Sequence, residues 1–321
     1  MFYRQITLAA SLALVCAAST GAMAAAKTPG PAVIEPGSPL LERLVDLERA
    51  PGSLCRPPDG DAETATLIEA LATRLRSQIE PGNGLGAVQA VNRLVFEELG
   101  IQPSRDLRDP RNLCLASVLS RREGYCVGIA SLYVVLAEEV GLPIHAVATP
   151  GHVFLRYDDG RTRINIETFQ RGAAVSDAEY IEREKIPAQS VARGVFLRTL
   201  SRDGLLAQIH NNLGVIHSEQ GDVDRATQEY ERAIDLDRNL AAAYYNWGSD
   251  LLRVDASQRA VRLLTQALDL WPTDVWALNN RGVAYRNLGK VKKARRDFEA
   301  ALMIAPDFGR AQENLATLPA Q

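Results

Sequence analysis

Residues of one type recur every 34 positions between residues 207 and 308, and this period constrains the fold more than any other feature of the sequence. The recurring sets are glycines, alanines and bulky side chains: Gly214, Gly248 and Gly282; Ala226, Ala260 and Ala294; Ala233, Ala267 and Ala301; Tyr230, Leu264 and Phe298. Pro272 and Pro306 share the same spacing. This pattern predicts two helices per repeat, which touch at the small residues and enclose the bulky ones. Residues 309–318 are expected to form a capping helix over the last repeat.

The repeats resemble the tetratricopeptide (TPR) family. Two positions depart from the family pattern, because Arg238 stands where the first repeat would carry proline and no glycine occurs near residue 255. The resemblance implies that residues 207–321 form an all-α solenoid whose concave face binds an extended peptide or a partner helix. A protein or peptide is therefore the expected partner of this part of the chain.

Polar residues within the repeats allow two interpretations. Asparagine recurs at one repeat position, as Asn212, Asn246 and Asn280. These side chains either donate hydrogen bonds to the backbone of a bound peptide or are structural amides that bridge neighbouring helices. His210 and His217 lie on one helical face, but no third ligand of suitable spacing accompanies them, so no metal site is predicted.

Length and charge bound the remaining possibilities. A chain of 321 residues predicts two domains. Its 36 basic and 39 acidic residues give a net charge of −3, which argues against nucleic acid or an anionic membrane as the main partner. Residues 40–185 are expected to form the first domain, and residues 186–206 a linker to the repeats. Helical patterns come first in that domain and β-like runs follow at 144–148, 153–157 and 163–169, which predicts an α+β fold.

The N-terminal segment has the features of a secretory signal. Arg4 precedes a mostly apolar run at residues 6–18, and Ala22, Met23 and Ala24 give a small-residue cleavage pattern. We expect a cleavable signal peptide over residues 1–24, cleavage near Ala24 and a periplasmic or secreted protein, with an uncleaved anchor as the alternative. Residues 25–39 are rich in alanine, proline and glycine and are expected to form a linker.

The cysteine count changes with cleavage. Cys16 leaves with the signal, and Cys55, Cys114 and Cys126 remain, which is an odd number in an oxidising compartment. The simplest arrangement pairs Cys55 with Cys114 and leaves Cys126 free. Three unrelated thiols, with Cys55 and Cys114 buried, are the alternative.

Three residues of the first domain have the types needed for thiol catalysis. Cys126 follows a glycine turn and falls at the start of an apolar helix, where free N–H groups and the helix dipole favour the thiolate. His152 opens a β-like run directly after a turn. Glu167 lies in a later run, on the opposite side from Ile164 and Ile166. If the two strands are neighbours, the Glu167 carboxylate can accept a hydrogen bond from the imidazole, as a cysteine nucleophile and its base require.

This arrangement resembles the transglutaminase-like superfamily, a papain-related α+β fold, and more closely its bacterial SirB-type group. The matching stretches include residues 94–100, 109–112, 118–124, 132–143, 150–152 and 167–169, together with Gly172. The resemblance implies Cys126 as nucleophile, His152 as base and Glu167 as the orienting acid, where the family usually carries aspartate. It implies no cofactor and no metal. Some members of the group lack the cysteine, so a non-catalytic fold is the alternative.

Other polar residues are weaker candidates. His145 could serve as the base, but its apolar neighbours indicate packing. Asp158 and Asp159 precede a glycine and are typical of a solvated turn. Arg156 could bind a substrate carboxylate, as could Arg121 and Arg122, although a solvated charged face is the simpler interpretation for these last two.

The sequence thus predicts an exported α+β papain/transglutaminase-like domain followed by an all-α TPR solenoid. The expected activity is that of a cysteine enzyme acting on amide or peptide bonds, by hydrolysis or transamidation, with the solenoid recruiting a protein or peptide. The alternative is an envelope scaffold in which protein binding by the repeats is the function. Thiol redox exchange is disfavoured because no C-x-x-C motif is present.

Overall fold

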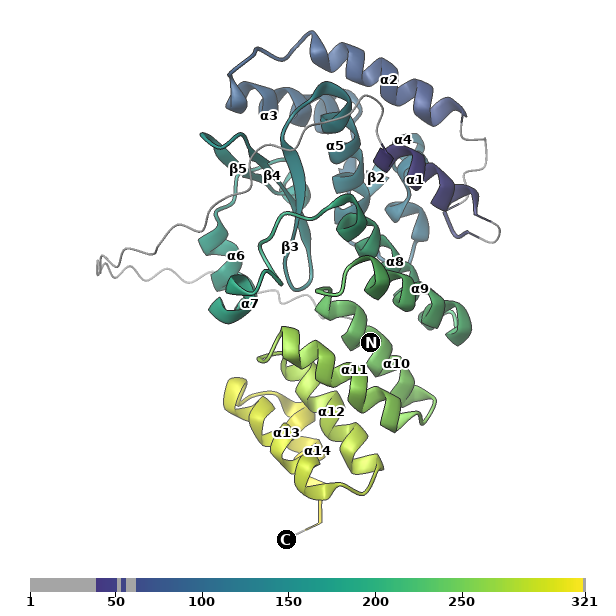
Figure 1. Ribbon diagram of the computed structural model, residues 1–321, viewed down its shortest axis with the longest axis vertical. Helices are drawn as coiled ribbons and strands as arrows, with labels where there is room; N and C mark the ends of the chain where they lie inside the picture. The colour runs from purple at the N-terminus through teal and green to yellow at the C-terminus, as the bar shows by residue number, and fades with distance from the viewer. Residues whose placement is uncertain (1–38, 51–52, 56–61, 320–321) are drawn as a thin grey trace, which may run out of the picture.

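The computed structural model describes residues 39–50, 53–55 and 62–319. The predicted signal peptide, 1–24, and nearly all of the predicted linker, 25–39, lie outside these residues. Within the described ranges, no helix has both the length and the apolar character needed to cross a membrane. Figure 1 shows the N-terminal domain above and the helical repeats below it.

The N-terminal domain begins with helices that surround one central helix. Its first elements are α1 (Pro39–Arg49), α2 (Ala62–Arg76), α3 (Gly84–Asn92), a π-helical turn (Arg93–Glu98), β1 (Gln102–Pro103), a 3-10 turn (Pro110–Leu113), α4 (Leu115–Arg121) and β2 (Glu123–Gly124). The central helix is α5 (Cys126–Val140), which is buried from Cys126 to Ala137 and ends at Gly141 in the left-handed conformation, φ 72°. Because α5 is apolar on all sides, it must be enclosed by other elements.

A three-stranded antiparallel sheet follows the central helix. Its order is β3 (Ile144–Ala148), β4 (Val153–Asp158) and β5 (Arg163–Ile166), with Leu155 paired to both Ala146 and Ile166. These side chains belong to the core around α5. The prediction of helices first and strands later is therefore confirmed.

The second face of this sheet is also covered, which the sequence did not indicate. Val147 and Phe154 pack there with Tyr180 of α6 (Asp177–Glu184) and with Phe196. The strand alternation is as expected, but Asn165 and Glu167 on this face are buried rather than solvated. Their polar atoms must therefore be hydrogen-bonded within the protein.

The segment 186–206, expected as a linker, is folded against the sheet. It contains α7 (Ala188–Ala192) and then follows the free edge of β3, where the N–H groups of Leu197 and Leu200 donate to Ala148 and Ala146 at 2.8 Å. Its Val195, Phe196 and Leu197 are buried. The two domains are thus joined by packed structure.

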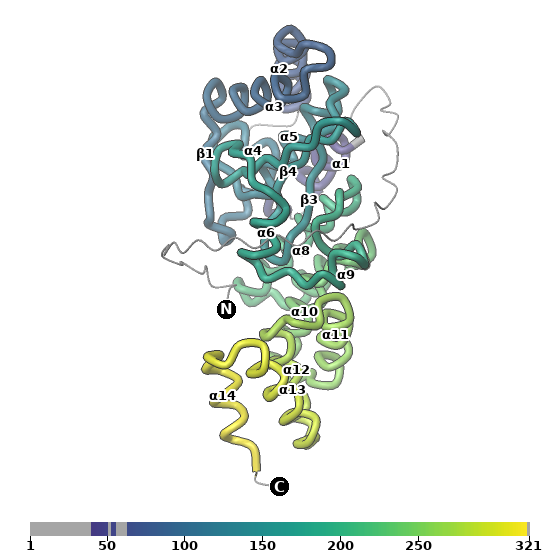
Figure 2. The backbone as a smooth tube through the Cα atoms, turned by 90° about the vertical axis from the view of Figure 1, so that its left-hand side faces the viewer, coloured from purple at the N-terminus to yellow at the C-terminus, as the bar shows by residue number. Residues whose placement is uncertain are grey.

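The repeats form paired antiparallel helices, as the 34-residue period predicts. The pairs are α8 (Arg202–Glu219) with α9 (Val223–Leu236), α10 (Ala241–Arg253) with α11 (Ser257–Leu270), and α12 (Val275–Asn287) with α13 (Val291–Ile304). Helix α14 (Gly309–Ala316) covers the last pair. Figure 2, a side view, shows the solenoid extending from the end of the first domain.

Contacts on two sides fix the solenoid against the first domain. Helix α8 packs its Leu205, Leu206 and Ile209 into the core around α5. On the other side, Phe196 meets Trp271 of the second repeat edge to face, with ring centroids 5.5 Å apart. The hydroxyl of Ser190 on α7 donates to the carbonyl of Leu270 at 2.9 Å.

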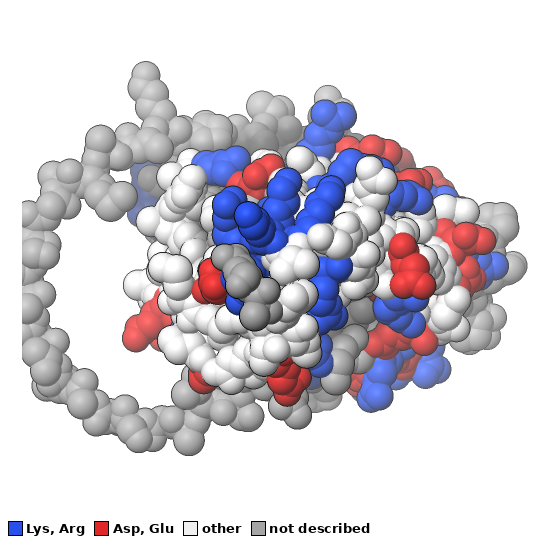
Figure 3. Space-filling model, turned by 90° about the horizontal axis from the view of Figure 1, so that it is seen from below, with Lys and Arg blue, Asp and Glu red and all other residues white. Residues whose placement is uncertain are grey.

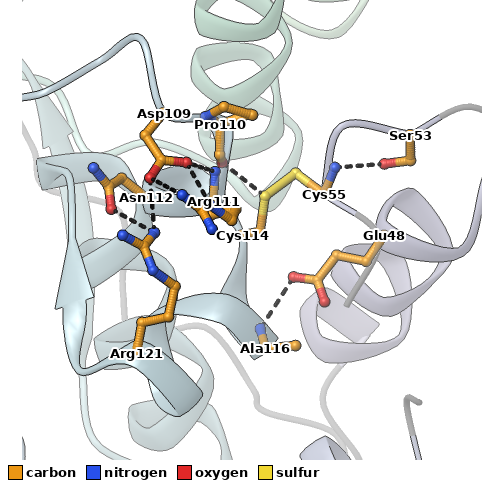
Figure 4. The surroundings of a disulfide bond; sticks show 10 residues. All are labelled: Glu48, Ser53, Cys55, Asp109, Pro110, Arg111, Asn112, Cys114, Ala116 and Arg121. Atoms are coloured by element: carbon orange, nitrogen blue, oxygen red, sulfur yellow. Dashed lines mark hydrogen bonds and ion pairs between the residues drawn. A yellow bond between two sulfur atoms is a disulfide. The ribbon is translucent and has the colours of Figure 1, made fainter. Parts of the chain in front are cut away.

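Cys55 and Cys114 form a disulfide, with their Cα atoms 5.4 Å apart (Figure 4). Among the described cysteines, Cys126 is the free thiol. The bond joins the segment after α1 to the start of α4, where the N–H of Ala116 also donates to Glu48 of α1 at 3.2 Å. The first of the two cysteine arrangements is therefore the one present.

Reducing the disulfide is expected to lower the free energy of unfolding. The bridged cysteines are 59 residues apart, and closing a loop of that length stabilises a fold by about 4 kcal/mol in the chain-entropy model. Urea unfolding with and without reductant measures the difference. Cys126→Ser is the matched control, because it should keep the full sensitivity to reductant. Equal stability in both conditions would contradict the prediction.

Gly282→Ala is expected to destabilise the solenoid by about 1–3 kcal/mol. A Cβ at Gly282 would lie 2.5 Å from Cε1 of Phe298, so helices α12 and α13 would have to separate. Gly309→Ala is the control, since a Cβ there meets nothing within 4 Å. Thermal unfolding of both variants makes the comparison, and a loss of similar size at both positions would argue against the close helix contact.

Candidate functional site

Cys126 is the first residue of α5, and the loop before it is held from the N-terminal side. The N–H of Tyr125 donates to the carbonyl of Asn112 at 2.8 Å. Gly128 allows this approach, because a Cβ there would lie 2.3 Å from the same carbonyl oxygen. The N–H groups of the first helical turn have no partner within the helix, and Cys126 is the first residue of that turn.

His152 lies in the tight turn between β3 and β4. Its carbonyl accepts from the N–H of Thr149 at 2.9 Å, which places the ring at the end of the sheet. The imidazole stacks on Phe169, with ring centroids 5.0 Å apart and planes 20° from parallel. Tyr125 meets the same phenyl ring edge to face, at 5.7 Å. These contacts fix the orientation of the imidazole beside the start of α5.

Glu167 holds one nitrogen of His152. The Nε2 atom lies 2.9 Å and 3.0 Å from the two oxygens of the carboxylate. The carboxylate also accepts from the hydroxyl of Tyr180 at 2.7 Å and from the N–H of Phe169 at 2.9 Å. Because Glu167 is only 2% exposed, these donors replace the water that a carboxylate normally requires.

The pKa values of this pair move apart. Burial lowers the pKa of His152, but its interactions with Cys126 and then with Glu167 outweigh burial and raise the pKa to about 10. Burial raises the pKa of Glu167, while its bonds to His152, Tyr180 and Phe169 outweigh that effect and lower it. Both shifts favour a charged pair at neutral pH.

The second ring nitrogen of His152, Nδ1, is not held by Glu167. It is buried and makes no hydrogen bond of ordinary geometry among the described residues, while charge attraction and a side-chain hydrogen-bond interaction with Cys126 raise the pKa of the ring. Both residues line the same cavity, which has a volume of about 1380 Å³. The fold thus brings all three predicted residues together in the order thiol, imidazole, carboxylate.

Sequence reasoning missed several residues that support this arrangement. Tyr180 comes 13 positions after Glu167 on another helix, and no local pattern marks it. Asn112 donates its amide to Ser104 at 3.2 Å and to the carbonyl of Asp106 at 3.0 Å, which orients the carbonyl facing Tyr125. Asn112 and Phe169 lie inside stretches noted for the family resemblance, but the sequence pattern assigned neither of them a role.

The competing candidates are placed elsewhere. His145 lies within β3, opposite Arg156, and burial lowers its pKa. Asp159 accepts from two backbone N–H groups of its turn, and Asp158 pairs with Arg163. Arg156 is buried and bonded to Asn165, Asp177 and the carbonyl of Leu197. The suggestion that Arg156 binds a substrate carboxylate is therefore wrong.

Two of the three repeated asparagines bridge neighbouring helices. Asn246 donates to the amide oxygen of Asn211 at 2.9 Å, and Asn280 donates to the hydroxyl of Ser249 at 2.9 Å. The structural alternative therefore holds for these two side chains. His210 pairs with Glu229 rather than with His217, and no group of three or more potential metal ligands occurs in the described part of the chain.

Comparison with known proteins gives the family. Residues 62–209 match the family model of the transglutaminase-like superfamily, and residues 207–240 and 275–308 match tetratricopeptide repeats. A UPF0162 protein of Xylella fastidiosa is 30% identical over 254 residues, which cover 78% of this chain and 79% of that protein. The chain belongs to the UPF0162 family. A second UPF0162 protein, from Pseudomonas aeruginosa, is 28% identical over 127 residues, 40% of this chain and 47% of its own length.

Two matches beyond the UPF0162 family each cover about a third of the chain. Human F-box only protein 21 is 28% identical over 112 residues, which are 32% of this chain and 18% of that protein. Among solved structures, a TPR domain of Spaghetti (RPAP3) bound to an HSP90 peptide is 25% identical, covers 35% of this chain and 90% of its own, and has a TM-score of 0.35. The middle repeat of the present chain, formed by α10 and α11, lies between the two matched repeats.

The ion pair of His152 and Glu167 is expected to stabilise the fold over a limited pH window. A raised histidine pKa contributes stability that is complete below about 6.5, the unfolded value, and is lost as the pH rises to about 10. A lowered glutamate pKa contributes above the unfolded value and is lost as the pH falls. Urea unfolding of His152→Gln, Glu167→Gln and the double variant should give a coupling energy on the order of 2 kcal/mol near pH 6.

The control for this set of single and double variants is His145→Gln, because burial lowers the pKa of His145, whereas the pKa of His152 is raised. Replacing His145 should not remove the part of the stability that is lost as the pH rises above 6.5. A coupling energy of His152 with Glu167 that stays constant from pH 6 to pH 10 would contradict the ion pair.

Proposed function

We propose that the protein is a cysteine acyl-transfer enzyme that acts on amide or peptide bonds through Cys126, His152 and Glu167. The observation that carries this proposal is the imidazole fixed between a buried carboxylate and a thiol at the start of a helix. A nucleophile, a base and an orienting acid in this order are what covalent catalysis by a thiol requires. Membership of the transglutaminase-like superfamily over residues 62–209 supports the same chemistry.

In the first half-reaction the Cys126 thiolate attacks the carbonyl carbon and forms the S–C bond, while the carbonyl electron pair moves to oxygen. When the carbonyl re-forms, the C–N bond breaks, and the leaving nitrogen takes the proton from Nδ1 of His152. In the second, neutral His152 accepts a proton from water or an amine as that group attacks the thioester. Expulsion of the thiolate then yields an acid or a new amide.

Neighbouring groups would stabilise the charges that develop. The free N–H groups at the start of α5 are suited to an oxyanion formed on the attacked carbonyl. Glu167 keeps the imidazolium charged while the thiolate is present, and Tyr180 and the N–H of Phe169 hold Glu167 in place. No step of this sequence needs a metal or a cofactor.

The proposal includes export and protein binding. The signal-like features of residues 1–24, together with the disulfide of Cys55 and Cys114, support a periplasmic or secreted protein, because disulfides persist in oxidising compartments. TPR solenoids present a concave face to extended peptides, so the repeats are proposed to bind a protein or peptide partner.

A non-catalytic scaffold is the second candidate, and the burial of Cys126 favours it. The residue is only 2% exposed, and a buried cysteine often serves as a small apolar side chain. The repeats would then carry the function alone. Reactivity of the thiol separates the two candidates, because an inert thiol cannot form an acyl-enzyme.

Iodoacetamide should alkylate Cys126 well below pH 8 in the wild-type protein and much more slowly in His152→Ala. The reason is that the positively charged imidazole stabilises the thiolate, which is the reactive form. A loss of about tenfold or more at pH 6.5 is expected, as for the removal of one strong charge interaction of about 1.4 kcal/mol. Peptide mass mapping across pH 5–9 measures the rate at Cys126 alone.

Two variants control for unrelated effects. His145→Ala removes a histidine from the same sheet and should leave the profile unchanged. Glu167→Asp keeps the negative charge and should retain more reactivity at pH 6.5 than Glu167→Gln. If the pH profile of alkylation is that of an ordinary free thiol in both the wild type and His152→Ala, the catalytic triad is contradicted. The non-catalytic scaffold is then the remaining candidate.

A further inference from the structure

The cavity at Cys126 does not end within the first domain. Its walls run from Cys126 and His152 to the inner face of the third repeat, where Trp276 and Asn280 of α12 and Arg310 of α14 line it. The thiol and the concave face of the solenoid therefore open into one space of about 1380 Å³. Two separate sites, one for chemistry and one for partner binding, would not share a cavity.

The part of the wall between the two ends comes from the elements that join the domains. Val195, Phe196 and Arg198 of the folded segment line the cavity, as do Asn212 and Val215 of α8. Arg198 also forms an ion pair with Asp237 at the end of α9. Because Val195 and Phe196 are buried and Arg198 is held by its ion pair, this part of the wall is a fixed part of the fold.

The charged side chains along the cavity are largely paired with one another. The pairs are Arg108 with Asp106, Arg198 with Asp237, and Arg253 with Asp250. Paired charges and amides suit the backbone and mixed side chains of a polypeptide better than a polyanion, which needs an excess of positive charge. Basic side chains do gather on the face seen in Figure 3. The lysines at the start of α13, Lys290, Lys292 and Lys293, do not line the cavity.

We propose that the polypeptide held on the concave face is itself the acyl substrate of Cys126. The occupant is an extended segment of another protein chain, bound along α8, α10 and α12, with the reacting bond at the α8 end. This inference rests on the proposed function and adds the substrate class. The solenoid is then the substrate-binding part of the enzyme and not a separate recruitment module.

The geometry sets the length of extended chain that is needed to span the concave face from α8 to α12. Successive inner helices pack about 10 Å apart, and an extended chain advances about 3.4 Å per residue. The two spacings from α8 to α12 therefore correspond to about six residues of extended chain. A shorter chain reaches the thiol without contacting the third repeat, whereas a longer one reaches Trp276 and Arg310 as well.

Iodoacetyl-capped peptide pools of random sequence test this arrangement on the full chain. Pools of three and twelve residues carry the iodoacetyl group on the N-terminal amine or on a C-terminal lysine, and free iodoacetamide is the reference reagent. We expect the twelve-residue pool to alkylate Cys126 about tenfold faster than the three-residue pool, because binding raises the effective concentration at the thiol. Arg310→Ala should reduce the rate for the long pool only.

Arg262→Ala is the matched control, since Arg262 is an exposed arginine of the solenoid that does not line the cavity. It should leave the alkylation rates of both pool lengths and of free iodoacetamide unchanged. Equal rates for the two pools, or equal effects of the two arginine variants, would overturn the shared substrate path. The peptide pools are compared at pH 9, where any accessible thiol reacts, so that their relative rates report binding alone. Failure of the Cys–His pair is detected separately, from the rate with free iodoacetamide at pH 6.5.

Discussion

Helix α8 belongs to two hydrophobic cores, and the rest of the architecture depends on that. Leu205, Leu206 and Ile209 complete the core around α5, while Ala207 packs with Ala233 and Leu240 of the repeats. Domains joined by a flexible linker are expected to move relative to each other. Here the first repeat cannot separate from the first domain without exposing apolar surface from both. The common cavity exists because this helix leaves no freedom at the junction.

The Cys126 site shows how a charged pair is tolerated inside a protein. Removing a carboxylate and an imidazolium from water is costly unless each remaining hydrogen-bonding atom finds a partner. Glu167 meets this condition with three donors, of which only His152 takes part in the proposed chemistry. Within the described part of the chain, Nδ1 of His152 makes no hydrogen bond of ordinary geometry, and Cys126 is the other group that raises the pKa of the ring. The carboxylate therefore has its full set of donors, whereas the imidazole keeps one nitrogen for the proton transfers of the proposed chemistry.

Features that depend on residues close together in the sequence were predicted, whereas features that depend on contacts between distant segments were not. The repeats and the α5 start were predictable because periodicity and turn residues are written in contiguous stretches, and so were Cys126, His152 and Glu167. Tyr180 was not, since its contact with Glu167 depends on where α6 folds back over the sheet. The same long-range packing buries Asn165 and Arg156. It also folds the segment 186–206, which was expected to be a linker, against the sheet. The role of Asn246 as a bridge required a neighbouring helix to be placed first.

Because the solenoid is built from 34-residue repeats, the length of its concave face is set by the number of repeats. Each repeat adds one inner helix to the face that begins at α8, so inserting or deleting one repeat after α9 changes the groove by one helix spacing of about 10 Å. That step equals about three residues of extended chain, and it leaves the junction and the thiol untouched. If the concave face holds the substrate, relatives with more or fewer repeats differ in the length of bound substrate chain. Each repeat changes that length by a fixed step of about three residues.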